Sequence, residues 1–309
     1  MMLGIDPKVD FVFKRLFGVP QNDESLIDVI NAVLKPRPGH GVVGVTLRNP
    51  YNEKEFEEDK LSIVDIKAED QSGRQFNIEM EMAPDRYFTK RVLYYWAKRY
   101  ADQLHEGQPY EELKKTIVIA FVNAAVFRQS PGYHHAFTIR DASNTLSFTD
   151  DFEGHILEIG KFDKQTGELA DPLDAWLFFL KNAERLDPAS LPSPLGRPGI
   201  QRAVKELTML TKEERERYEA RLRAVRDERS RLLSARLDGI EEGEAKGRSE
   251  GRSEGQAQNL CEVISSLAKA LGRMIDNEDL AKRSVAELKT IQDGLLAEVI
   301  SRGHANGKS

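Results

Sequence analysis

The segment from Leu61 to Met82 constrains the fold more than any other part of this sequence. It holds two runs in which the side chains alternate with a period of two, separated by a turn at Gly73. Such alternation is typical of β-strands, so the segment predicts a β-hairpin with its loop at residues 70–74. This pairing places Glu69 opposite Gln75, which sets the register of every other pair.

The predicted register also places Asp65 opposite Glu79, with Lys67 and Glu81 on the same face of the hairpin. Two facing carboxylates repel each other unless a cation lies between them. Carboxylate oxygens are hard ligands that suit Mg²⁺ or Mn²⁺, and a further acid, Asp10, lies on a predicted helix. A bound ion of this kind lowers the pKa of a water ligand and neutralises charge on a phosphate oxygen.

The rest of the first 186 residues predicts an alternation of helices and strands. The periodicity predicts helices, the first opened by Asp6 and Pro7, at 6–17, 23–34, 85–106 and 173–183. It predicts strands at 42–47 and 115–122, and weaker ones at 136–140, 145–148 and 155–160. This order is typical of an α/β protein.

The composition changes after residue 186. A Pro-rich linker is predicted at 187–200, and a charged helical segment at 201–258. Within that segment Gly239, Gly243, Gly247, Gly251 and Gly255 recur every fourth residue. These glycines either allow two helices to approach closely or weaken the helix into a linker, and we favour close approach. Two amphipathic stretches at 259–309 predict a small helical assembly module, so we expect a homo-oligomer.

The net charge and the cysteine content exclude several classes of protein. The net charge of -6 argues against a protein that coats nucleic acid by bulk charge, so DNA contact needs a local basic patch. The predicted helix at 85–106 supplies one through Lys90, Arg91 and Lys98. The single cysteine excludes a disulfide framework. With no apolar run long enough to cross a bilayer, we expect a cytoplasmic protein and no membrane partner.

Each candidate residue also has a simpler interpretation. Asp65 and Glu79 fit a solvated strand face, and Lys67 fits a salt-bridge partner for them. Asp10 fits an ordinary helix pair with Lys14. The basic residues Arg91 and Lys98 fit a solvated helix face. His134 and His135 are predicted to be surface residues, because neighbouring strand residues point to opposite faces and do not easily share one ion.

Several motifs follow one another in a fixed order along the chain. Asp10, Phe13 and Lys14 come first, followed by the run DIKAEDQSGRQFNIEME from Asp65 to Glu81. The later motifs are Arg91, Tyr95, Gly107, Tyr110, the run HILEIGKF ending at Phe162, and Trp176. Their joint order resembles the recombination-promoting nuclease (Rpn) family, also called PD-(D/E)XK nuclease family transposases, and the likeness covers residues 6–181 in one continuous order.

The resemblance implies a restriction-endonuclease-like core, with a central mixed sheet flanked by helices, spanning residues 1–186 and followed by a helical C-terminal extension. It implies Mg²⁺-dependent hydrolysis of DNA, with Asp65 and Glu79 as metal ligands and Asp10 as an auxiliary acid. The family usually has Glu-x-Gln on the second strand, and the wider superfamily has Glu-x-Lys, whereas this chain has Glu79-x-Glu81. A third carboxylate can bind a metal but cannot donate a hydrogen bond to water. Lys67 or Lys90 is then expected to take the donor role.

Three functions follow from the sequence. The first is a metal-dependent endonuclease that acts on DNA, with Glu81 as a further metal ligand. The second is a nuclease-fold protein that binds DNA or a partner but cuts poorly, because Glu81 replaces the usual residue. The third is an oligomeric scaffold in which the C-terminal helices are the functional part.

Overall fold

The computed structural model describes residues 2–48 and 66–306 of the chain. The chain divides into two compact units, Met1–Arg226 and Asp227–Ser309, which are described separately below. The predicted start of the hairpin, residues 61–65, lies outside the described residues, and Asp65 lies there with it.

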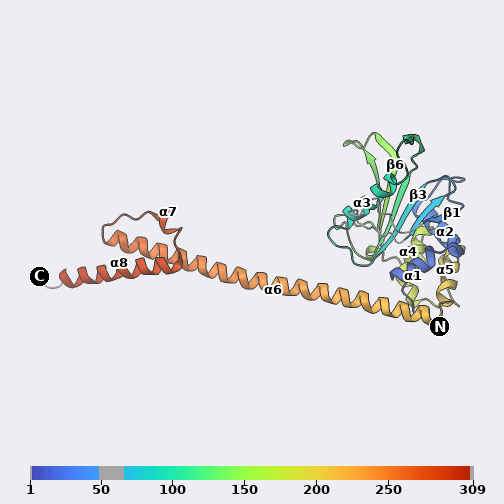
Figure 1. Ribbon diagram of the computed structural model, residues 1–309. Coiled ribbons are helices and arrows are strands. Elements are labelled where there is room, and N and C mark those ends of the chain that lie inside the picture. Colours follow the sequence, from blue (N-terminus) through green and yellow to red (C-terminus); the bar gives the residue numbers. More distant parts are fainter. Residues whose placement is uncertain (1, 49–65, 307–309) are drawn as a thin grey trace. The chain divides into compact units, whose positions relative to one another are not determined.

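The first unit is built on a mixed β-sheet (Figure 1). Its described strands are β1 (Val45–Arg48), β2 (Ile66–Asp70), β3 (Gln75–Glu81), β4 (Thr116–Val122), β5 (His134–Arg140) and β6 (Ser147–Glu158). They lie in the order β1-β2-β3-β4-β6-β5. The pairs β3–β4 and β4–β6 are parallel, and the other pairs are antiparallel. The predicted central mixed sheet is therefore confirmed.

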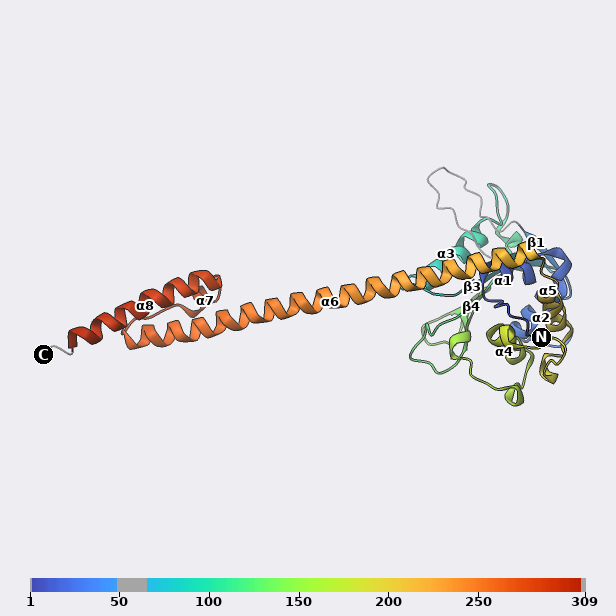
Figure 2. The same cartoon turned by 90° about the horizontal axis from the view of Figure 1, so that it is seen from below.

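Helices cover both faces of this sheet (Figure 2). One layer consists of α1 (Asp10–Phe17), α2 (Asp23–Leu34), α4 (Pro172–Asn182) and α5 (Pro198–Thr208). Their apolar stripes pack on Phe76, Ile78 and Phe121 of the sheet in one buried cluster. Trp176 lies in this layer and is fully buried, with its ring 5.5 Å from that of Phe17.

The opposite face carries α3 (Phe88–Ala101), which connects the parallel strands β3 and β4. Phe88 and Val92 of this helix pack on Val118 and Ala120 in a smaller apolar cluster. Residues with odd numbers on β3 point to this α3 face, because Phe76 and Ile78 point to the other. The polar side of the predicted hairpin is therefore the side that α3 covers.

The hairpin has the predicted register. Glu69 pairs with Gln75, and the ladder continues to the pair Ile66–Ile78. Asp70 closes the loop, because its carboxylate accepts hydrogen bonds from the backbone N–H groups of Ser72 and Arg74 at 2.9 and 3.0 Å. Gly73 takes a φ of +84°, which favours glycine.

Two predicted elements differ from the structure. Asp6 does not cap a helix, because its carboxylate accepts from the backbone N–H and the ammonium of Lys8, at 2.9 and 2.7 Å, and α1 begins only at Asp10. The weak strands predicted at 145–148 and 155–160 form the single strand β6. Within this strand Asp151 accepts a 2.6 Å hydrogen bond from the Tyr100 hydroxyl.

The segment predicted as a linker leads directly into α5, which packs against α2. Ile200, Val204 and Leu207 of α5 are buried in the main cluster. Asp28 of α2 joins three segments, since it accepts from the Trp176 indole at 2.9 Å and from the guanidinium of Arg197. The structure therefore extends the first compact unit well beyond residue 186.

The second unit contains most of α6 (Lys212–Ala270), followed by α7 (Asn277–Leu280) and α8 (Val285–Asn306). An apolar cluster joins the end of α6 to α7 and α8, and its members include Leu260, Ile264, Leu280 and Leu288. The two predicted amphipathic stretches are therefore helices that pack on each other.

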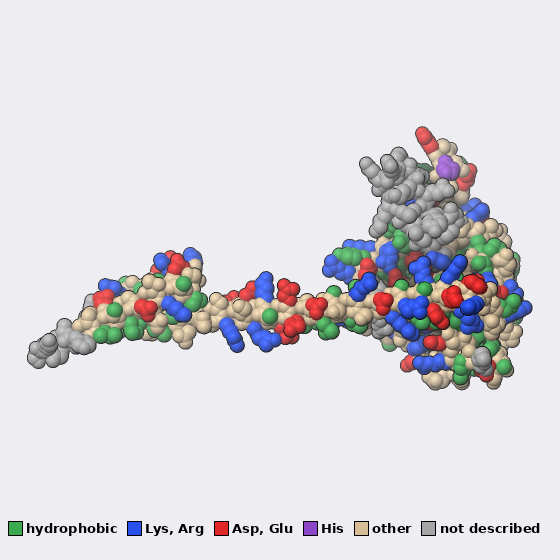
Figure 3. Space-filling view, turned by 60° about the horizontal axis from the view of Figure 1, so that its bottom comes forward, with side chains coloured by type: hydrophobic (Ala, Val, Ile, Leu, Met, Phe, Trp, Pro, Cys, Tyr) green, Lys and Arg blue, Asp and Glu red, His purple; other side chains and the backbone are tan. Residues whose placement is uncertain are grey.

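The glycine repeat lies inside α6 and does not interrupt it. Beyond the adjacent residues and backbone of α6 itself, a Cβ atom added at any of these glycines would meet no described atom within 4 Å. Charged side chains of both signs are interspersed along α6 (Figure 3). None of the helices formed by residues 2–48 and 66–306 has an apolar stretch of the length that a bilayer requires.

Candidate active site

Three polar side chains of the hairpin are buried beneath α3. Lys67 is 3% exposed, Asn77 is fully buried, and Glu79 is 7% exposed. Lys67 pairs with Asn77 across the strands, and Glu79 is the next residue on the same face of β3. Burial of charged groups is unfavourable unless they are paired or bind an ion, and both Lys67 and Glu79 take part in polar or electrostatic interactions.

Glu81 lies at the end of β3 and forms an ion pair with Arg91 of α3. The same guanidinium lies 3.4 Å from the carboxylate of Asp85, and Glu81 also accepts from the backbone N–H of Ala83 at 3.2 Å. The Glu81 side chain is 26% exposed and that of Arg91 is 30% exposed. Arg91, which is predicted to bind DNA, is therefore held at the proposed site by Glu81, one of the acids of that site.

The other end of this polar face is neutralised by arginines. Glu69 forms a 2.7 Å ion pair with Arg48 of β1, and Arg99 of α3 donates to the side-chain oxygen of Gln75. Burial raises the pKa of Glu69, but the hydrogen bonds from Arg48 and Gln75 outweigh it and leave the pKa below its usual value. Burial lowers the pKa of Arg99. At this end of the polar face, the charged side chains therefore have partners within the protein.

The donor atoms near Glu79 suit a hard divalent ion. Glu79 and Glu81 are two residues apart on one strand face, about 7 Å along the chain, so their carboxylates can reach a common ion. Asn77 donates to the backbone oxygen of Tyr95 at 3.2 Å, and its own side-chain oxygen accepts no hydrogen bond from a described residue. Within the described ranges no three acidic, His or Cys side chains form a complete metal-binding group. The predicted ligand Asp65 lies outside those ranges.

Asp10 belongs to a helix rather than to the hairpin. It lies on α1, whose buried residues pack on the opposite face of the sheet. Its side chain is 43% exposed and lies 4.0 Å from the ammonium of Lys14, one turn later. This is the helix pair that the simpler interpretation of Asp10 predicted.

The remaining predicted DNA-binding residues differ in what surrounds them. Lys98 lies 3.7 Å from Asp102 on the same helix, and its side chain is 15% exposed. Lys90 is exposed, lies 6.0 Å from the ring centroid of Tyr87, and forms no ion pair with a described residue. Of the three, Lys90 is therefore best placed to meet a phosphate.

His134 and His135 point to opposite faces of the sheet, as the alternation predicted, but both are half-buried rather than surface residues. His134 hydrogen-bonds His155 at 2.8 Å, and His135 hydrogen-bonds Glu158 at 2.9 Å. Burial, together with the neighbouring His155, lowers the pKa of His134 to about 4. They therefore belong to two separate side-chain networks.

Two further residues near the site, Asn77 and Arg128, were not predicted from the sequence. Asn77 is one of several polar residues that alternate along the strand, and only its complete burial in the structure distinguishes it. Arg128 lies in the irregular segment between β4 and β5, where no periodic pattern marks a position, and it helps to line a depression with Arg86 near the start of α3. A basic residue in an isolated loop carries no sequence signal for this role.

The fold and the site together define an α/β protein with acidic and polar side chains gathered on the α3 face of a mixed sheet. The family described as PD-(D/E)XK nuclease family transposase matches residues 7–235. The chain therefore belongs to this family. No curated protein and no solved structure gives a significant match.

Proposed function

We propose that the protein is a Mg²⁺-dependent endonuclease that hydrolyses DNA phosphodiester bonds in the cytoplasm. The main support is the row of polar and acidic groups formed by Lys67, Asn77, Glu79 and Glu81 beneath α3, in a chain of a nuclease family. The test is cleavage of supercoiled plasmid with and without Mg²⁺ by the wild type and by variants of Asp65 and Glu79.

The proposed roles follow from the chemistry of each group. Asp65 and Glu79 hold Mg²⁺ or Mn²⁺, and Glu81 supplies a third carboxylate when Arg91 turns from it to a phosphate oxygen. A bound ion supplies an activated water and offsets charge on the phosphate. The ammonium of Lys67 has donors but no acceptor, so it orients a water through that water's lone pair. Lys90 and Lys98 hold the DNA backbone as positive charges.

A second candidate function is supported by the ion pair between Glu81 and Arg91. In this view the carboxylate of Glu81 is neutralised by the protein itself, and the site lacks the donor that a glutamine or lysine would give. The protein would then bind DNA and cut it poorly.

One substitution separates these two candidates. Glu81→Gln keeps a hydrogen-bond acceptor for Arg91 but removes one negative ligand. If Glu81 binds the ion, we expect cleavage to fall about tenfold and the Mg²⁺ concentration needed for half-maximal rate to rise. The measurement is the nicking rate as a function of Mg²⁺ concentration.

The matched variant is Asp85→Asn, which weakens the other contact of Arg91 without touching the strand. It should leave the Mg²⁺ dependence unchanged. Faster cleavage by Glu81→Gln than by the wild type would favour the poorly active nuclease instead.

We also propose that the second unit assembles copies of the chain. Leu233, Leu237 and Ile240 lie at helical spacing on α6 and are 51%, 65% and 49% exposed. Apolar side chains in such a row suit a helix–helix contact better than contact with water.

Deletion of Gly239–Ser309 should therefore lower the particle mass to that of a smaller assembly, because it removes Ile240, the glycine repeat and the α7–α8 helices. Light scattering after size-exclusion chromatography measures this mass. The matched variant Lys246→Ala, which changes only an exposed charge, should keep the wild-type mass. A deletion that leaves the number of chains per particle unchanged would exclude this role for the second unit.

A further inference from the structure

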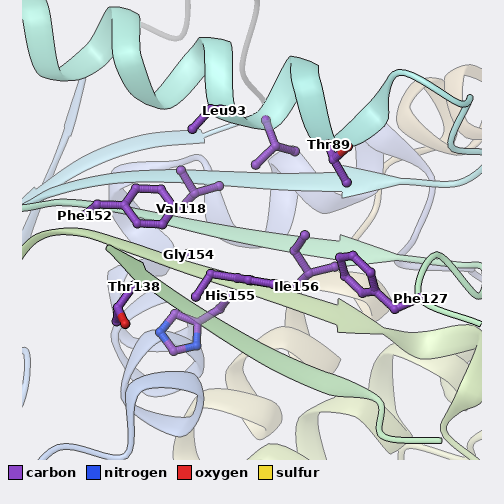
Figure 4. Close-up of a pocket in the computed structure, with 11 residues that line it drawn as sticks. Thr89, Leu93, Val118, Phe127, Thr138, Phe152, Gly154, His155 and Ile156 are labelled. Atoms are coloured by element: carbon purple, nitrogen blue, oxygen red, sulfur yellow. The ribbon is translucent and has the colours of Figure 1, made fainter. Parts of the chain in front are cut away.

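An apolar groove lies on the α3 face of the sheet, on the other side of α3 from the acids. It has a volume of about 470 Å³ and is lined by α3, β4, β5, β6 and Phe127. In Figure 4 Thr89 and Leu93 come down from α3, Val118, Phe152 and Ile156 come from the strands, and Phe127 closes one end. Its size falls within the range of small-ligand sites.

Three aromatic rings, those of Phe127, Phe137 and Phe152, line the groove. Phe127 and Phe137 have ring centroids 5.4 Å apart and are inclined by 47°. Phe152 packs edge-on against Trp96 with centroids 4.9 Å apart. Phe137 remains 40% exposed and Leu93 55% exposed, so apolar surface at the groove is open to solvent. Rings in such an arrangement offer faces and edges to a flat partner.

Gly154 keeps the floor of the groove open. It pairs with Phe137 across β5 and β6, and a Cβ atom at this position would lie 3.1 Å from the Phe152 ring. Any larger residue would therefore push the end of that ring away from its present position. The cavity depends on a residue without a side chain in the middle of a strand, where glycine is otherwise unfavourable.

Positive charge borders the groove at the start of α3. A second depression, lined by Arg86, Arg128 and Asp85, shares Thr89 and Phe127 with the groove, and Asp85 lies 3.4 Å from Arg91. Arg86, Arg128 and the nearby Lys90 are exposed and form no ion pair with the described part of the chain. Their charges are therefore available to an anionic partner.

The acidic site is close along the same helix. Arg91, which binds Glu81, lies between Thr89 and Leu93, which line the groove. These α3 residues span about one helical turn, roughly 5 to 6 Å along the axis. The groove and Glu81 lie on opposite sides of this helix, which is about 10 Å across with its side chains, so a strand a few nucleotides long can reach both places.

We propose that this groove binds an unpaired base of the DNA on which the nuclease acts. The aromatic and aliphatic lining suits the flat face of a base, and Arg86, Lys90 and Arg128 suit its phosphates. A base inside a duplex is stacked and paired and cannot enter, so the preferred substrate contains a single-stranded segment beside the scissile phosphate. The identity of the ligand as DNA rests on the proposed function.

An apolar peptide is the main competing occupant, but it fits less well. It would leave Arg86 and Arg128, which form no ion pair with a described residue, without an anionic partner beside the groove. A single nucleic-acid strand satisfies both the apolar lining and the charges.

The test measures binding without cleavage. Full-length protein is titrated, with EDTA present, into a fluorescein-labelled 20-nucleotide single strand and, separately, into the matching duplex. Phe137→Ala removes an exposed ring, and Gly154→Val fills the floor. We expect each to weaken single-strand binding about tenfold and to change duplex binding by less than about twofold. Equal melting temperatures establish that the variants are folded.

The matched control is Phe148→Ala, which removes an 82% exposed ring on β6 that does not line the groove. It should bind the single strand as the wild type does. A 2-aminopurine in the single strand gives a second readout, because insertion among the rings should change its fluorescence with wild type and not with Gly154→Val.

Single-strand binding by Phe137→Ala and Gly154→Val equal to that of the wild type would overturn the proposal. It would also be overturned if these two variants lost self-association and kept their binding to DNA. The outcome is separate from the nuclease assay. If the wild type cuts plasmid but groove variants bind normally, the groove assignment alone fails. If single-strand binding depends on the groove but neither the wild type nor any variant cuts plasmid, the nuclease assignment alone fails.

Discussion

Replacement of Glu79 by glutamine should reduce Mg²⁺-dependent DNA cleavage at least about a hundredfold. The substitution keeps the shape of the side chain and one oxygen ligand but removes the negative charge. Glu79 is 7% exposed beneath α3, so water cannot easily replace that charge at the proposed ion. The measurement is the rate of conversion of supercoiled plasmid to nicked or linear DNA, with the same comparison for Asp65→Asn.

Glu69→Gln is the matched control. Glu69 lies on the same face of the hairpin, but its charge is neutralised by Arg48 at 2.7 Å rather than by a proposed metal ion. It should cleave at close to the wild-type rate. Residual cleavage at equal rates in the wild type, Glu79→Gln and Asp65→Asn would identify a contaminating nuclease and remove the enzymatic assignment.

A chain that ends at residue 186 should fail to fold, whereas a chain that ends at residue 226 should give a folded, cooperative unit. The shorter chain lacks α5, which covers α2 with Ile200, Val204 and Leu207. Burial of three such side chains contributes about 5 to 9 kcal/mol, a large part of the roughly 5 to 15 kcal/mol that stabilises a domain. Thermal unfolding followed by circular dichroism measures the difference.

The polar contacts of α5 point to the same result. The Ser25 hydroxyl donates to the backbone oxygen of Gly199 at 2.8 Å, and Arg15 lies 3.0 Å from Glu206. Ile200→Ala in the longer chain is the graded control, with an expected loss of about 2 to 5 kcal/mol and a retained transition. A cooperative transition in the 1–186 chain would show that α5 is dispensable for the fold.

The hairpin was predictable because its determinants are local. The alternation along 61–82 and the turn at Asp70 and Gly73 act over a few residues, and they lead to the observed pair Glu69–Gln75. The bounds of α2 were predictable for a similar reason, since the helix starts in an acidic turn at Asp23 and ends just before Pro36. In both cases residues close in sequence determine the outcome.

The parts that escaped prediction depend on contacts between distant segments. Arg91 was assigned to DNA from its helix alone, but the fold brings it to Glu81 on the preceding strand. The prolines before α5 suggested a linker, and only the packing of that helix on α2 shows otherwise. The groove rings Phe127, Phe137 and Phe152 come from three separate segments, so no window of sequence shows them together.

The glycine row of α6 limits how a second helix can lie against it. Residues four apart on an α-helix are rotated by about 40° relative to one another, because each residue turns the chain by about 100°. From Gly239 to Gly255 the glycine row, a strip of the helix surface without side chains, therefore winds through roughly 160° around the helix axis. A neighbouring helix that follows the strip must wind with it in the right-handed sense, opposite to an ordinary heptad coiled coil. A straight neighbour meets the strip over only a few turns.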